Sequence, residues 1–281
     1  PQIDNRYLYW FLKGNTKYLN SLGRGATFKE ISKQIVSNIE INVPSLEQQH
    51  RAVTHLEKVN AVVGLRKRQL QKLDELVKAR FVEMFESMQW DTVRASSIMS
   101  NMRNGVSPSN RGHFPAKVLT LSAITQGAFD PSKWKDGMFD TNPPVEKRVC
   151  TTDFYMCRGN GNKNLVGTGV YSTKNRFDLV FPDTIIAASI DLQRVCMPYL
   201  AYVWKRQAVR KQIESGARTT NGTYKVNQGV ISSVEIPLPP IELQAEFAAF
   251  AEQTDKSKVV IQKALDEAQV LFDSLMQQYF E

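Results

Sequence analysis

The chain has 281 residues, and the 42% that are apolar are enough to bury one large core or two of ordinary size. Its 36 Lys and Arg against 28 Asp and Glu give a net charge of +8, which favours a polyanionic partner without proving one. The three cysteines, Cys150, Cys157 and Cys196, lack C-x-x-C spacing, which argues against a disulfide framework and a cysteine zinc site. A reducing cytoplasm fits this cysteine content best. No apolar run reaches the roughly 18 residues needed to cross a bilayer, so we expect no interaction with membranes.

The positive charge is concentrated in the middle of the chain. Residues 1–44 carry a net charge of +3, residues 45–86 carry +2, residues 87–240 carry +8 and residues 241–281 carry −5. The middle segment therefore fits a polyanion, and the acidic last segment fits contacts with protein. The chain also opens on Pro1 rather than Met and runs directly into an apolar pattern, from which we expect that the N-terminal part of a longer protein is absent.

The first expected elements are an amphipathic helix over Tyr7–Leu22, a turn at Gly23 and Gly25, and a short β-branched strand that ends at Pro44. Proline ends the strand because it has no N–H to extend a ladder. Several apolar residues of the helix are expected to cover the core of a domain that the chain lacks, and so to form an exposed patch. These residues are Tyr7, Leu8, Trp10, Phe11 and Leu12.

A long helix is expected next. Its apolar residues recur every seven positions, at Leu56, Val63, Leu70, Val77 and Met84. The last segment keeps the same spacing, at Leu265, Phe272 and Tyr279, with Val260 and Leu271 among the supporting residues. A seven-residue repeat favours two helices wound around each other, and about 40 residues at 1.5 Å each give a rod of ~60 Å. We expect the two helices to pair antiparallel, although two core helices of an ordinary domain remain the alternative.

The segment from Trp90 to about Val195 has a different character, because short β-branched and aromatic runs alternate with Gly and Pro. It predicts a compact mixed α+β domain. The strand candidates are Val118–Leu121, Phe154–Met156, Leu165–Val166, Val170–Tyr171, Leu179–Phe181 and Thr184–Ile186.

The end of the chain repeats its beginning. A shift of 195 places residues 31–86 over residues 226–281 without a gap, with eleven identities in 56 positions. Several identities cluster at one strand–proline–helix junction, which makes chance less credible than duplication. The clustered pairs are Ser37 with Ser232, Glu40 with Glu235, Ile41 with Ile236, Pro44 with Pro239, Glu47 with Glu242, and Gln49 with Gln244. A helix over Tyr199–Ser215 and a strand ending at Pro237 complete the second copy.

This order of parts resembles the specificity subunit of type I restriction-modification systems. The resemblance rests on the junction Pro239-Pro240-Ile241-Glu242-Leu243-Gln244 and on its earlier copy at Val43-Pro44-Ser45-Leu46-Glu47-Gln48-Gln49. The segments 105–108 and 158–162 also resemble motifs of the family's target recognition domains. The resemblance implies a mixed α/β recognition domain and long helices that form an antiparallel coiled coil. Residues 1–44 would be the end of a first recognition domain, 45–89 a spacer helix, 90–240 a second recognition domain and 241–281 a second spacer helix.

The resemblance also implies a function. The chain would be a non-catalytic, sequence-specific subunit that directs methylation and cleavage to a bipartite site in double-stranded DNA. Modification subunits that carry S-adenosylmethionine would dock on the helices, and restriction subunits would join later. This chain itself would hold no cofactor.

The residues alone indicate where DNA contacts are expected. The segment R-G-N-G-N-K-N at 158–164 combines amides and cations, which pair with base edges, with glycines that let the backbone approach a phosphate. A plain hairpin turn is the alternative. Two other polar loops and a basic helix complete the set. The basic helix could hold phosphates, or its charged face could simply be solvated. The candidates are Arg158, Asn160, Asn162, Lys163 and Asn164; Ser107, Asn110 and Arg111; Arg218 and Asn221; and Lys205 and Arg210 on the helix.

Catalysis by this chain is not indicated. Asn142-Pro143-Pro144 is similar to the site of amino-methyltransferases, but Val145 stands where an aromatic residue would hold a flipped base. The three histidines do not make a metal set. Two other hypotheses stay open: the specificity region of a single-chain restriction-methylation enzyme, and a coiled-coil interaction scaffold that binds no DNA.

Overall fold

The structure is a computed structural model that describes residues 2–25, 29–86, 88–220 and 222–280. It divides into two compact units. Unit 1 comprises Pro1–Lys78 with Gln253–Glu281, and unit 2 comprises Ala79–Glu252. The boundary between the units falls within both long helices, and the domain boundaries expected after residues 44, 89 and 240 stay predictions.

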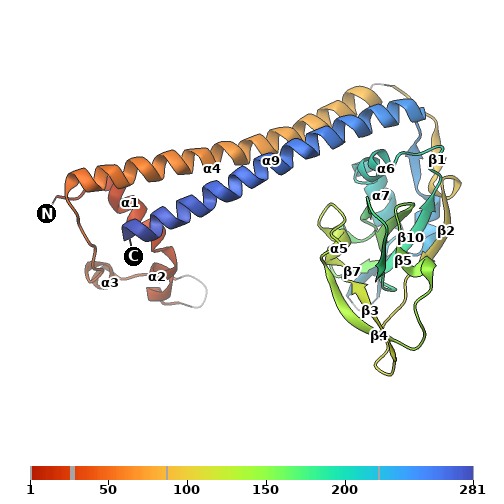
Figure 1. Cartoon of the computed structure of the whole chain (residues 1–281), viewed down its shortest axis with the longest axis horizontal. Helices are drawn as coiled ribbons and strands as arrows, with labels where there is room; N and C mark the ends of the chain where they lie inside the picture. The colour runs from red at the N-terminus through yellow and green to blue at the C-terminus, as the bar shows by residue number, and fades with distance from the viewer. Residues whose placement is uncertain (1, 26–28, 87, 221, 281) are drawn as a thin grey trace. The chain divides into compact units, whose positions relative to one another are not determined.

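The two long helices are present as expected, α4 over Leu46–Phe81 and α9 over Ile241–Phe280. A capping box starts α4, since the backbone N–H of Gln48 donates to the Ser45 hydroxyl and that of Ser45 to Gln48 Oε1. In unit 1 the helices lie side by side (Figure 1). His55 contacts Tyr279 across the pair at 2.7 Å, and Asp74 contacts Lys258 at 2.8 Å. Residue numbers rise along one helix as they fall along the other, which confirms the antiparallel pairing.

The seven-residue stripe provides the buried face of this pair. Leu56, Val63 and Val77 are each less than 9% exposed, and so is Leu265 on α9. Two of the supporting positions were wrong, because Val260 is 70% exposed and Leu271 is 50% exposed. Leu271 precedes Phe272 by one residue and Val260 precedes Leu265 by five, so neither is on the seven-residue stripe, and apolar character alone does not decide which side of a helix is covered.

Unit 1 also contains short helices, α1 over Asn5–Gly14, α2 over Thr16–Leu22 and α3 over Lys33–Ser37. Of these, α1 packs on the start of α4 and the end of α9. Trp10 meets Phe272 edge to face at 5.6 Å between ring centroids, and Tyr7 lies 5.1 Å from Phe280. The expectation of an exposed patch was therefore wrong for Tyr7, Trp10 and Phe11, which are at most 8% exposed, although Leu12 is 39% exposed. The apolar face of α1 is covered by α9 and by the start of α4.

Unit 2 is the mixed α+β domain that the sequence predicts, and it holds all the named strands. They are β1 Thr92–Arg94, β2 Met99–Asn104, β3 Phe114–Leu119, β4 Trp134–Phe139, β5 Arg148–Val149, β6 Asp153–Cys157, β7 Gly159–Asn160, β8 Gly169–Tyr171, β9 Arg176–Val180, β10 Ile185–Ile190, β11 Arg218–Thr220, β12 Thr223–Lys225 and β13 Glu235–Pro237. Its α-helices are α5 Ser122–Thr125, α6 Met197–Val203, α7 Gln207–Gly216 and α8 Gln228–Ser233, and short 3-10 or π turns cover Val82–Glu86, Ala95–Ser97, Val145–Lys147 and Lys163–Leu165.

These strands form four sheets. The antiparallel sheet β2-β10-β6-β8 and the mixed sheet β4-β3-β9-β5 each have four strands. A small sheet has the order β11-β12-β7, and β1 pairs with β13. The two four-stranded sheets share one core, in which Leu119 and Leu179 of the mixed sheet meet Tyr155 and Ile185 of the antiparallel sheet. A buried ion pair between Arg103 and Asp153 joins β2 to β6.

Candidate nucleic-acid interface

The segment Arg158–Asn164 is built around a tight turn after β6. Oδ1 of Asn160 accepts a hydrogen bond from the backbone N–H of Asn162 at 2.9 Å, and Oδ1 of Asn162 accepts one from that of Asn164 at 3.0 Å. Both contacts are local side-chain to backbone bonds of the kind that shape loops. The side chains of Asn162, Lys163 and Asn164 remain exposed, so the turn presents them to solvent.

The small sheet brings two of the predicted loops together. Asn160 of β7 pairs with Tyr224 of β12, and β12 pairs in turn with β11, where Arg218 faces Lys225. A Cβ atom added at Gly159 would lie 3.2 Å from the Lys225 side chain and 3.4 Å from the Tyr224 carbonyl oxygen, so glycine permits this close approach. Asn221 lies outside the described residues.

The structure adds a cation that the sequence analysis missed. Lys225 is exposed on β12, directly across from the exposed Arg218. The sequence analysis could have found Lys225 only through an alternating strand pattern around Tyr224, and a strand of three residues is too short to show that pattern. With Lys163, the small sheet and its turn therefore present three exposed cations, and we call the group of Asn162, Lys163, Asn164, Arg218 and Lys225 the basic hairpin surface.

Arg158 is less available than its neighbours. Its Nη1 donates to the Asp183 carbonyl oxygen at 3.2 Å and lies 3.9 Å from the Asp183 carboxylate. The side chain is 38% exposed. The ion pair leaves part of the guanidinium accessible, but a base contact requires Arg158 to give up or share Asp183.

The expected basic helix is interrupted. Because α6 ends at Val203 and α7 begins at Gln207, Lys205 lies in the turn between them, where its Nζ donates to the Gly127 carbonyl oxygen at 2.6 Å. Arg210 lies on α7 but is only 14% exposed, and its Nη2 donates to the Val166 carbonyl oxygen at 2.7 Å. Burial lowers the pKa of Arg210. Through these contacts Arg210 holds the backbone that follows the turn, at Asn164 and Val166. Phosphate contact by Lys205 and Arg210 stays a prediction.

The third predicted loop lies on a different sheet. Ser107, Asn110 and Arg111 are exposed on the connection between β2 and β3. The loop is held to β4, because the backbone N–H of Ser109 donates to the Met138 carbonyl oxygen at 2.8 Å. This connection therefore belongs to the mixed sheet, whereas the basic hairpin surface belongs to the small one.

The Asn-Pro-Pro segment is a braced turn. Nη2 of Arg148 donates to the Asn142 side-chain oxygen at 2.9 Å, and its Nε donates to the Pro143 carbonyl oxygen at 3.2 Å. Val145 is 70% exposed beside it. Among the described residues, no group of three or more His, Cys, Asp or Glu side chains is arranged to hold a metal ion, and no helix is long and apolar enough to span a membrane.

Comparison with known proteins agrees with this architecture. Residues 1–75 match the family described as type I restriction modification DNA specificity domain. The type I restriction enzyme EcoKI specificity subunit of Escherichia coli (strain K12) is 22% identical over 279 residues, which cover 92% of this chain and 60% of that protein. The chain is a relative of the type I specificity subunits. The EcoDI specificity subunit of Escherichia coli is 21% identical over 319 residues, covering 98% of this chain and 68% of its own.

The fold is shared as well. The crystal structure of the type I restriction-modification S subunit from M. genitalium superposes with a TM-score of 0.63 at 15% identity, covering 99% of this chain and 73% of that one. This likeness confirms the predicted α+β class with long helices. The chain spans about 60% of the length of the EcoKI relative.

Proposed function

We propose that this chain is a DNA-recognition subunit of a type I restriction-modification complex. Residues 90–240 would be a whole target recognition domain, residues 1–44 the end of another, and residues 45–89 and 241–281 the spacer helices. The observation that carries the proposal is the basic hairpin surface, in which one small sheet joins two loops that offer amides and cations together. Amides and guanidinium groups read base edges, and lysines neutralise phosphates.

The chemistry would belong to partners. Modification subunits would bring S-adenosylmethionine and methylate the DNA, and restriction subunits would cleave it, all in the cytoplasm. The specificity-subunit names of the relatives support a recognition role for this chain.

The proposal is tested by selecting duplexes from a random pool with the purified chain at several salt concentrations. We expect one enriched sequence motif and an affinity that falls as salt rises, because each neutralised phosphate releases counterions. Lys225→Ala should weaken binding to all duplexes alike and flatten the salt dependence. Asn162→Ala should erode the preference for the motif, by about 1–3 kcal/mol if it removes a bidentate base contact.

Lys263→Ala is the matched control, because it removes an exposed cation from α9, where the Lys263 side chain is 80% exposed. It should leave both affinity and motif unchanged. Equal loss with Lys263→Ala and Lys225→Ala would mean that net charge alone attracts DNA. Salt-independent retention, or none, would contradict the proposal and favour the interaction scaffold.

A further inference from the structure

A buried glutamine ties the first turn of α4 to the chain around it in unit 1. Gln49 is 0% exposed. Its Nε2 donates to the carbonyl oxygens of Pro44 at 2.8 Å and Gln2 at 3.1 Å, and its Oε1 accepts from the backbone N–H of Asp4 at 2.7 Å. One side chain thus binds the residues just before α4 and those just before α1.

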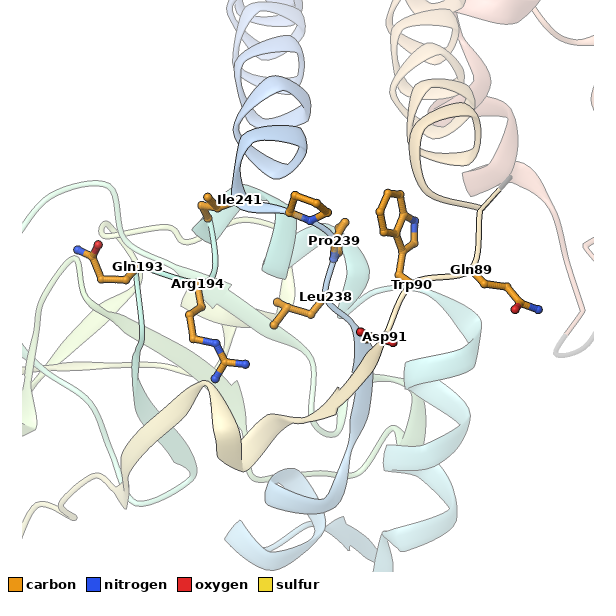
Figure 2. A pocket seen from close by; sticks show the side chains of 9 residues that line it. Gln89, Trp90, Asp91, Gln193, Arg194, Leu238, Pro239 and Ile241 are labelled. Atoms are coloured by element: carbon orange, nitrogen blue, oxygen red, sulfur yellow. The ribbon is translucent and has the colours of Figure 1, made fainter.

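Unit 2 repeats this arrangement at the start of α9. Gln244 is also 0% exposed. Its Nε2 donates to the carbonyl oxygens of Pro239 at 2.8 Å and Arg194 at 3.0 Å, and its Oε1 accepts from the backbone N–H of Cys196 at 3.0 Å. Figure 2 shows Arg194 and Pro239 on the two segments that meet at the base of α9, beside Ile241. We call each set of three hydrogen bonds a junction clamp.

The two clamps correspond atom for atom. Gln49 and Gln244 are 195 residues apart, as are Pro44 and Pro239. The other two anchors are 192 residues apart in both copies, Gln2 with Arg194 and Asp4 with Cys196. All of these anchors, Pro44 and Pro239 included, contribute only backbone groups, so the glutamine is the side chain that the arrangement needs.

Glutamine suits this position for a chemical reason. Its amide supplies two donors and an acceptor from one planar group, whereas a carboxylate offers no donor and an apolar side chain offers neither. In a buried site each unmade bond costs the desolvation of a polar group, which makes the arrangement of the three backbone segments specific.

We propose that Gln49 and Gln244 are positioning residues that fix the direction in which each long helix leaves the segment before it. The consequence for DNA reading rests on the proposed function. If the chain reads DNA, a fixed exit direction of the helices sets the separation at which two half-sites are read together. Each clamp joins the first turn of a long helix to the residues that begin α1 or α6. Loss of a clamp frees the angle between them while leaving both elements folded.

The experiment measures that direction with pairs of spin labels on the whole chain. Labels at Lys135→Cys on β4 and at the exposed Ala249→Cys on α9, both in unit 2, report on Gln244, in a background of Cys150→Ser and Cys196→Ser. Cys157 stays, because burial raises the pKa of its thiol to about 11 and suppresses labelling. Ala249 lies five residues beyond Gln244, in the part of α9 that belongs to unit 2, so the distance reports the direction of α9 within one unit.

Gln244→Met is the test variant, because it keeps the side-chain volume and removes all three hydrogen bonds. We expect the single narrow distance of the parent to become broad or shifted, while the circular dichroism spectrum is retained. The control is Gln212→Met, since Gln212 also exchanges two hydrogen bonds with backbone, those of Glu235 on the strand before the junction, but takes no part in the clamp. It should keep the narrow distance.

An unchanged distance in folded Gln244→Met overturns the proposal, even if the melting temperature falls, because the clamp would then be only structural. Equal broadening in Gln212→Met overturns it too. If Gln244→Met does not fold, Gln49→Met decides in the same way, with labels at Lys17→Cys on α2 and Arg68→Cys on α4. Duplex selection with the parent chain separates the two claims, since absence of DNA binding contradicts the proposed function and leaves the distances valid.

Discussion

Unit 1 and unit 2 contain two copies of one motif in different surroundings. Both copies keep the junction clamp, and both place a tyrosine hydroxyl on an equivalent carbonyl oxygen: Tyr199 donates to Pro237 at 2.9 Å and Tyr7 to Asn42 at 3.3 Å. They differ at the strand. Residues 235–237 form β13 because β1 pairs with them, whereas residues 40–42 form no strand within the described part of unit 1. The clamp recurs with the glutamine that forms it, but a strand requires its partner.

The two copies also fill their aromatic contacts differently. Phe247 of unit 2 is 0% exposed and meets Tyr202 at 5.1 Å between ring centroids. The equivalent of Phe247 in unit 1 is Ala52, and the equivalent of Tyr202 is the larger Trp10. Ala52 and Trp10 belong to one buried cluster. Unit 1 therefore combines a smaller residue with a larger ring where unit 2 has two rings of similar size, so the larger ring partly compensates for the smaller residue.

Phe247→Ala gives unit 2 the residue of unit 1 and should have the largest effect. Because residue 202 is a tyrosine and not the larger tryptophan, the variant leaves a cavity beside Phe81 and Phe85. The ring centroids of these two residues lie 5.4 and 5.7 Å from that of Phe247. We expect a loss of about 3–5 kcal/mol in the free energy of unfolding of unit 2. Hydrogen exchange of α6 peptides measures it, with α1 peptides as the internal control. Equal loss in both units would show that the two are not independent.

The converse change, Ala52→Phe, sharpens the same comparison with a smaller effect. The larger ring enters a site that Trp10 already fills, so overpacking should cost about 1–3 kcal/mol in unit 1. The double variant Ala52→Phe, Trp10→Tyr copies the pair of unit 2 and should recover part of that loss. Hydrogen exchange of α1 peptides measures the loss in both variants. No recovery in the double variant would contradict the pairwise exchange.

The sequence predicted the long helices, their antiparallel pairing and the mixed domain, because each depends on a pattern that repeats over many residues. It did not predict that the helix expected over Tyr7–Leu22 divides after Gly14, or that residues 204–206 interrupt the one expected over Tyr199–Ser215. Leu165–Val166 is not a strand, and β2 and β4 were missed, since pairing across the chain decides short strands. The sequence also could not predict that the two loops of the basic hairpin surface come together, because the paired residues Asn160 and Tyr224 are 64 residues apart.

The helix that precedes each junction tests whether local caps are equivalent in the two units. Asn227 caps α8 by accepting from the backbone N–H of Val230 at 2.9 Å, and Ser32 caps α3 by accepting from that of Ile35 at 3.3 Å. Asn227→Ala and Ser32→Ala should each cost about 1 kcal/mol. Thermal melts of the single variants and hydrogen exchange of the capped helices measure the loss. A loss at Asn227 alone would mean that α3 is held by neighbours rather than by its cap.

The smallest expected effect concerns Asp4, which caps α1, whereas the equivalent Cys196 makes no side-chain cap for α6. Backbone N–H groups of Tyr7 and Arg6 donate to the Asp4 carboxylate and hold its pKa below the usual value. A lowered pKa in the folded state means that the carboxylate stabilises unit 1 above the unfolded pKa, near 3.8, and that this contribution disappears as the pH falls through the folded pKa. Asp4→Asn should therefore lower the melting temperature of unit 1 at neutral pH and match the parent in strong acid. The same titration with Cys196→Asp should show a gain at neutral pH that is lost in acid, since the change adds an acidic cap to α6. A difference between Asp4→Asn and the parent that does not depend on pH would assign the contribution of Asp4 to the shape of its side chain rather than to its charge.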